Sequence, residues 1–363
     1  MATTKRILSL DVLRGLTVAL MIVVNNSGGH DRFSMLAHSA WNGLTPCDLV
    51  FPFFLFIMGV STSISLSRRG TRLDKPLLGK ILRRTFLIIL VCWCVQWFDH
   101  IVYGEFFPFA HLRLTGVLVR IALSYGIVAL LASSIGHRHF LWLIPVLLIG
   151  YALILLYGNG YANDHSNILY RTDALLLTDN HLYRWAKVDP EGLLGLIPSV
   201  AHTMIGYLCG VVFMRMNSDA NASRWRFLVR FSSVAVLMIV LAEVLSGILP
   251  INKPIWSPTY VLVTCGLAML VLVVLYLITD MASKTRWTSF FQVFGTNPLA
   301  LYVLSEIIAI VFDATGFHEW FYGVLTSLIA APKIASLCYA LLYMLLLWLI
   351  GLPLWKRHII IKL

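Results

Sequence analysis

The stretch HSAWNGLTPCDLVFPFFLFIMGVS, residues 38–61, places a histidine, a tryptophan, an asparagine and an aspartate directly before a run of apolar residues. The apolar run begins after Asp48 and continues to about residue 67. A membrane-spanning helix needs about 20 mostly apolar residues. The stretch therefore predicts a transmembrane helix that begins immediately after a group of polar side chains.

The whole chain has the composition of an integral membrane protein. Of its 363 residues, 59% are hydrophobic and only 12% are charged, and the mean hydropathy is +0.83. Soluble domains carry about 25% charged residues. We therefore expect an all-α polytopic membrane protein in which residues 1–363 form one transmembrane domain.

Apolar runs of the required length predict a bundle of about ten transmembrane helices. The first run contains Asp11 and Arg14 and is followed by no small-residue cleavage site, so we expect a retained helix and not a cleaved signal peptide. The predicted spans cover residues 10–27, 49–67, 79–98, 114–135, 140–157, 192–214, 228–249, 258–279, 289–312 and 334–354.

The basic residues lie mainly in alternate connections between these spans. Lys5 and Arg6 precede the first span, and further clusters fall within 68–84 and 215–230. The positive-inside rule places this side, and with it both termini, in the cytoplasm. Such clusters are typical of topology signals and contacts with anionic lipids, so the net charge of +11 predicts no nucleic-acid partner. We expect a location in the plasma (inner) membrane, with residues 38–48 on the outer, periplasmic side.

His38 and Asp48 are the polar residues best suited to chemistry. Histidine is the side chain that most readily exchanges a proton near neutral pH, and a neighbouring carboxylate can fix its tautomer. The alternative interpretation is a solvated loop histidine. Glu306, well inside a predicted span, is expected to line a polar interior because ionisable groups at membrane depth cost about 2.5–3.5 kcal/mol on insertion scales. Cys47 is interpreted as a free thiol, with a catalytic cysteine as the alternative, and no cysteine spacing predicts a metal site.

Several longer motifs resemble the heparan-alpha-glucosaminide N-acetyltransferase family of transmembrane enzymes. The resemblance begins with SLDVLRGLTVALMIVVNN at 9–26 and continues through the stretch at 38–61. It extends, in order, to DPEGLLGLIPS at 189–199, INKPIWSPTYVLVT at 251–264 and GTNPLALYVLSE at 295–306. The resemblance therefore covers nearly the whole chain.

This resemblance implies transfer of an acetyl group from cytoplasmic acetyl-CoA to the amine of glucosamine or a terminal glucosaminide on the outer side. We expect no metal cofactor. The catalytic residues of the family fall on His38, Asp48 and Asn25. A homodimer is also expected from the resemblance. The outer loops and the last polar span supply the candidate acceptor contacts, which are Trp41, Asn42, Asp189, Glu191, Asn252, Lys253 and Glu306. Position alone suggests that the phosphates of CoA meet Arg14, Arg83 and Arg84.

The chain departs from the lysosomal family members in its N-terminal region. Those members carry a lumenal region and a further helix before the shared core, whereas this sequence reaches the first motif almost directly, as in a bacterial-type enzyme. We therefore expect a free amino sugar or a short fragment as the acceptor. The residues leave open whether His38 acts as a general base or carries the acetyl group. They also leave open an amino-sugar transporter and an O-acetyltransferase of an envelope glycan.

Overall fold

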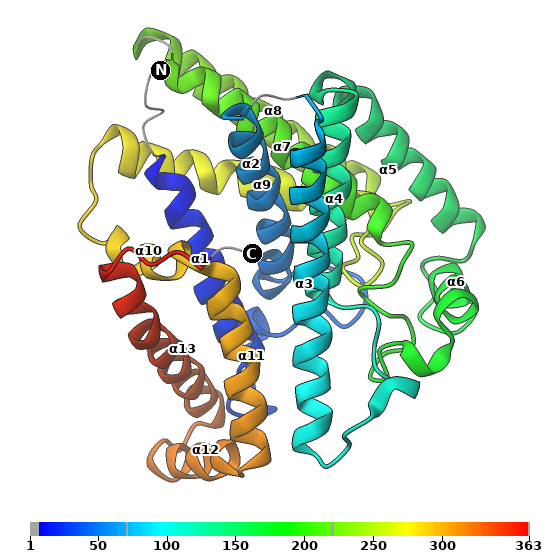
Figure 1. The fold of residues 1–363 in the computed structure, drawn as a ribbon, viewed down its shortest axis with the longest axis vertical. Helices are drawn as coiled ribbons and strands as arrows, with labels where there is room; N and C mark the ends of the chain where they lie inside the picture. The colour runs from blue at the N-terminus through cyan, green and yellow to red at the C-terminus, as the bar shows by residue number, and fades with distance from the viewer. Residues whose placement is uncertain (1–6, 70–71, 219–220, 362–363) are drawn as a thin grey trace.

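The computed structural model describes residues 7–69, 72–218 and 221–361, and these residues form helices and connections without a β-strand (Figure 1). Lys5, Arg6 and the last two residues lie outside the described part. The helices are α1 (Leu8–Asn25), α2 (Val50–Ser67), α3 (Lys75–Val102), α4 (Val117–Ser134), α5 (Phe140–Tyr157), α6 (Ile168–Leu177), α7 (Leu196–Ser218), α8 (Asn221–Leu245), α9 (Pro258–Tyr276), α10 (Thr288–Thr296), α11 (Pro298–Ala314), α12 (Phe317–Leu328) and α13 (Pro332–Lys356).

The helix lengths confirm the predicted multi-pass class. Within the described residues, nine helices are long and apolar enough to cross a membrane, and a bent pair brings the number to ten if it counts as one span. The short helix α6 lies in the connection after α5, and α12 lies in the connection between α11 and α13. In Figure 1 the beginnings of α1, α3 and α5 lie in the upper part of the bundle and α12 lies at the bottom.

The ninth predicted span, residues 289–312, is wrong as a continuous helix. The chain breaks between α10 and α11, whose axes differ in direction by 81°. Pro298 lacks a backbone N–H and disfavours a helical conformation at the preceding residue, so Asn297 leaves the helix with φ −129° and ψ 58°. The Asn297 side chain instead donates to the carbonyl of Ile359 and accepts from the N–H of Ile361. The break therefore anchors the C-terminal segment.

Helices α2 and α7 pack with their backbones in direct contact. A Cβ atom added at Gly59 would lie 2.2 Å from the carbonyl oxygen of Thr203, and one added at Gly206 would lie 2.2 Å from that of Phe56. Small residues allow such close approach between membrane helices, where packing and not water exclusion drives association. The two glycines therefore set how closely α2 approaches α7.

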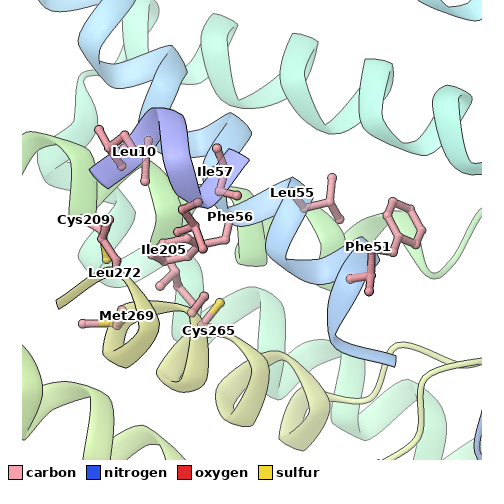
Figure 2. Packing of buried hydrophobic residues seen from close by; sticks show 14 of the residues in the cluster. Leu10, Phe51, Leu55, Phe56, Ile57, Ile205, Cys209, Cys265, Met269 and Leu272 are labelled. Carbon is pink, nitrogen blue, oxygen red and sulfur yellow. The ribbon is translucent and has the colours of Figure 1, made fainter. Parts of the chain in front are cut away.

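A cluster of buried side chains joins this helix pair to α9. Figure 2 shows Phe56 and Ile205 packing toward Cys265 and Met269 between the three helices. At the end of α2 where the polar loop begins, the ring of Phe51 meets that of Trp256 edge-on with centroids 4.9 Å apart. The apolar core thus holds the start of α2 against the connection that precedes α9.

We predict that Gly206→Leu prevents folding. The added side chain would collide with backbone, so its cost should exceed the roughly 1–3 kcal/mol of ordinary overpacking. Gly150→Leu is the matched control, because nothing lies within 4 Å of a Cβ at that position. Size-exclusion chromatography in detergent should give a monodisperse peak for the control and aggregate for Gly206→Leu. Equal behaviour of the two variants would contradict the close α2–α7 packing.

Candidate active site

Asp48 is held in the short 3-10 helix η2 (Pro46–Leu49) immediately before α2. Pro46 suits the first position of such a turn, and Thr45 and Asp48 form a capping box around it. The Oδ2 atom of Asp48 accepts from the backbone N–H and the hydroxyl of Thr45 at 3.1 and 3.0 Å, and from the N–H of Ser39 at 3.2 Å. The sequence TPCD therefore places a fully buried carboxylate at one end of the bundle with its lone pairs largely satisfied.

His38 completes the carboxylate's set of partners. Its Nδ1 atom donates to Oδ1 of Asp48 at 2.7 Å. The imidazole is 53% exposed, whereas the Asp48 side chain is fully buried. An ionised carboxylate only accepts hydrogen bonds, so Nδ1 carries the proton and Nε2 keeps its lone pair. The predicted pairing is confirmed, and it presents Nε2 as a base in the tautomer that proton abstraction requires.

Lys253 and Cys47 lie against the same imidazole. The Nζ atom of Lys253 is 3.0 and 3.4 Å from the two ring nitrogens of His38 and 3.4 Å from Oδ1 of Asp48. The Cys47 sulfur is 3.2 Å from Nδ1 of His38. The pair is thus surrounded by one cation and one thiol. Lys253 was predicted to contact the sugar that accepts the acetyl group, and Cys47 was predicted to be a free thiol or a catalytic cysteine. The sequence did not predict that both side chains lie against His38.

Two further connections close around the His38 loop. The N–H of Gly43 donates to the carbonyl of Ile251 at 2.8 Å, and the Asn252 amide donates to the side-chain oxygen of Asn42 at 3.0 Å. The indole N–H of Trp41 donates to the carbonyl of Tyr161 at 2.9 Å. The predicted residues Trp41, Asn42, Asn252 and Lys253 therefore gather near His38. Asn252 is buried and also accepts from the N–H of Ile255, so it holds the loop in place.

Asn25 and Glu306 form a second polar group within the bundle. Glu306, on α11, interacts with the side chains of Tyr302 and Asn25. Asn25 is the last residue of α1. Within the described part of the chain, Asn25 makes no hydrogen bond or ion pair with His38 or Asp48. The catalytic role that the resemblance implies for Asn25 stays a prediction, and its contact with Glu306 accounts for a carboxylate at this depth.

Asp189 and Glu191 meet Arg113, which sequence reasoning missed. The Nη2 atom of Arg113 donates to Asp189 and to Glu191, each at 2.6 Å, and the hydroxyl of Thr115 donates to Asp189 at 2.6 Å. Burial by itself would raise the pKa of Asp189, but the Arg113 charge and these hydrogen bonds hold it below its ordinary value. The oxygens of Asp189 are occupied, which favours a positioning role over direct contact with a substrate.

The three arginines suggested for CoA lie on two separate parts of the bundle. Arg14 pairs with Asp11 one turn earlier at 3.4 Å, and its Nη2 donates to the hydroxyl of Ser61 on α2 at 2.7 Å. Arg83 and Arg84 are exposed on α3, and the guanidinium of Arg84 lies over a tyrosine ring of α4. The structure brings these residues into no common cluster, so their contact with phosphates stays a prediction.

A bundle of membrane-length helices with a buried carboxylate and a half-exposed histidine at one end defines a polytopic membrane protein with an acid–base pair at its surface. The family model described as heparan-alpha-glucosaminide N-acetyltransferase, catalytic, matches residues 6–240. Because this match covers most of the chain, the protein belongs to that family, and the resemblance seen in the motifs is confirmed.

Curated relatives agree with this family membership. The chain is 31% identical to the heparan-alpha-glucosaminide N-acetyltransferase of Mus musculus, over 85% of this chain and 54% of the relative. It is 30% identical to the protein of the same name from Homo sapiens, over 84% of this chain and 53% of the relative. The chain thus spans about half the length of the curated relatives it matches.

We predict that Arg113→Met destabilises the fold, because it leaves two carboxylates without their cation. Removing one partner of a buried ion pair costs about 3–5 kcal/mol, and since Arg113 is 22% exposed the lower part of that range applies. The control is Arg184→Met, a change at an exposed arginine of the connection that carries Asp189 and Glu191. Thermal unfolding in detergent should show a lower Tm for Arg113→Met alone. Equal Tm values for both variants would show that the Arg113 cluster carries no stability.

Proposed function

We propose that the protein transfers an acetyl group from cytoplasmic acetyl-CoA to the amine of glucosamine or a terminal glucosaminide on the outer side of the membrane. The observation that carries this proposal is the 2.7 Å hydrogen bond from a half-exposed His38 to a buried Asp48. Family membership supports it, because the relatives are named as N-acetyltransferases. The basic connections support a cytoplasmic position for the opposite end of the bundle.

In the direct route, His38 acts as the general base. The amine of glucosamine is mostly an ammonium ion at neutral pH and cannot attack a thioester until it loses a proton. Nε2 of His38 takes that proton first, and the free amine then attacks the acetyl carbonyl. The CoA thiolate leaves and takes the proton that the nitrogen loses as the amide forms, and His38 returns its own proton to water. Asp48 keeps the imidazole in the required tautomer and stabilises its charged form. General-base catalysis of this kind contributes roughly 10²–10⁴-fold in rate.

In the two-step route, His38 carries the acetyl group. Nε2 attacks the thioester, CoA leaves as the thiol, and the amine then attacks the acetyl-imidazole and frees the histidine. Both routes develop negative charge on the acetyl oxygen. The Lys253 ammonium, 3.0 Å from the imidazole, is well placed to stabilise that charge. The side-chain N–H groups of Asn42 are a second group that can stabilise this charge by donating hydrogen bonds, since the side-chain oxygen of Asn42 already accepts from Asn252.

The donor and the acceptor approach from different ends of the bundle in this proposal. Arg83 and Arg84, exposed on α3, and Arg14 on α1 are the proposed partners of the CoA phosphates. Trp41 and Asn42 are the proposed acceptor contacts, since both belong to the loop that carries His38. We further propose a homodimer in a plasma membrane, supported at present by the family relationship alone, and light scattering of the detergent complex tests it.

The experiment incubates the purified protein with acetyl-CoA and glucosamine and follows free CoA and N-acetylglucosamine by mass spectrometry. We predict that His38→Ala lowers the rate by at least about 10²-fold and that Asp48→Asn, nearly isosteric, folds and lowers it by roughly 10²–10⁴-fold. His30→Ala, at an exposed histidine of the same connection, is the control and should keep the activity.

Two results would overturn the proposal. Failure to release CoA with any amino sugar would exclude N-acetyl transfer and leave the transporter and the O-acetyltransferase as the functions to test. A folded His38→Ala variant as active as the parent would leave acetyl transfer standing but would remove His38 from it. Labelled acetyl-CoA without an acceptor separates the two routes, because only the two-step route leaves label on the protein.

A further inference from the structure

Three potential metal ligands converge at the end of α3, in the α3–α4 connection. Nδ1 of His100 lies 2.8 Å from one carboxylate oxygen of Glu105, and Nε2 of His111 contacts the other oxygen. One ligand atom from each of the three residues lies within 4.8 Å of the others, and all three side chains are half-buried. No other group of three or more histidine, cysteine or acidic side chains in the described residues meets this condition.

We propose that His100, Glu105 and His111 form a zinc site. Two imidazoles and one carboxylate form a ligand set found in zinc proteins, and the fourth position is then left for water. The local chain suits the arrangement, because Gly104 adopts φ +88° and turns the chain so that Glu105 lies back against the last turn of α3. The proposal is independent of acetyl transfer, since none of the three residues belongs to the His38 site.

The ligand atoms, which lie within 4.8 Å of one another, have to rearrange to accept the ion. Zinc binds imidazole nitrogen at about 2.0–2.1 Å and carboxylate oxygen at about 2.0–2.2 Å, so two ligands in a tetrahedral site are about 3.3 Å apart. The separation of 2.8 Å between His100 and Glu105 therefore has to open by about half an ångström. The protons that now lie between nitrogen and oxygen move to the other nitrogen of each ring, so the neutral histidines bind without net change in charge.

The site would order a connection on which the Arg113 cluster depends. His111 lies two residues before Arg113, and Arg113 holds Asp189 and Glu191. An ion bound to residues 100, 105 and 111 would tie this connection to the end of α3 and so preserve the approach of Arg113. In this proposal the ion holds the connection in place and is separate from the His38 site. The sequence predicted no metal, because the three ligands follow no recognised metal-binding spacing.

The test uses the full-length protein without a polyhistidine tag, stripped of metal with a chelator and titrated with Zn²⁺ against a chromophoric chelator. We predict one equivalent of zinc per chain and a higher Tm when it binds. Glu105→Gln and His111→Ala should each weaken binding by at least the 10- to 100-fold typical of losing a supporting partner. His165→Ala, an exposed histidine of another connection, should bind as the parent does.

Cobalt distinguishes this site from binding to the free cysteines, of which Cys94 is exposed. Co²⁺ on the proposed ligands should show no sulfur-to-cobalt charge-transfer band. The proposal is overturned if zinc does not bind stoichiometrically, if Glu105→Gln binds it with unchanged affinity, or if the cobalt spectrum shows thiolate. Glu105→Gln is nearly isosteric, so a monodisperse sample of this variant separates loss of the ligand from loss of the fold.

Discussion

The structure depends on how it accommodates one buried carboxylate. An ionised group removed from water is costly unless hydrogen bonds and an opposite charge replace its hydration. Asp48 is fully buried, and it obtains these replacements from Thr45, Ser39, His38 and Lys253. Each partner comes from a loop at the same end of the bundle. The need to satisfy Asp48 therefore draws together the groups that the proposed chemistry uses.

The helix packing supplies the precision that this arrangement needs. Backbone contact between α2 and α7 fixes the position of α2, and the Tyr260 hydroxyl on α9 donates to the carbonyl of Asp48 at 2.6 Å. Lys253 lies in the short connection before α9, so the same helix that supports Asp48 also delivers the cation. The His38 imidazole remains 53% exposed. The bundle thus encloses the carboxylate and leaves the imidazole open to solvent, which is the distribution that a base acting on an external substrate requires.

Much of the fold and the centre of the site could be predicted from the sequence, because both are encoded locally. Long apolar runs report helices directly, and His38 and Asp48 lie ten residues apart in one motif. The break at Asn297 was missed, although Pro298 was visible, because hydropathy continues across it. Arg113 is 76 residues from Asp189, and Lys253 is 215 residues from His38. Such contacts arise only when the helices pack together, and no local sequence pattern predicts them.

The central claim is that the acetyl group passes from acetyl-CoA on one side of the membrane to an amine on the other side. Reconstituted vesicles test this claim most directly. Glucosamine is sealed inside proteoliposomes, labelled acetyl-CoA is added outside, and the label in N-acetylglucosamine is measured inside and outside after the vesicles are separated from the medium. The account predicts labelled product inside, from those molecules whose basic end faces outward, and at least about 10²-fold less in vesicles made with Asp48→Asn. Labelled product that forms only when glucosamine and acetyl-CoA share one compartment would contradict transfer across the bundle.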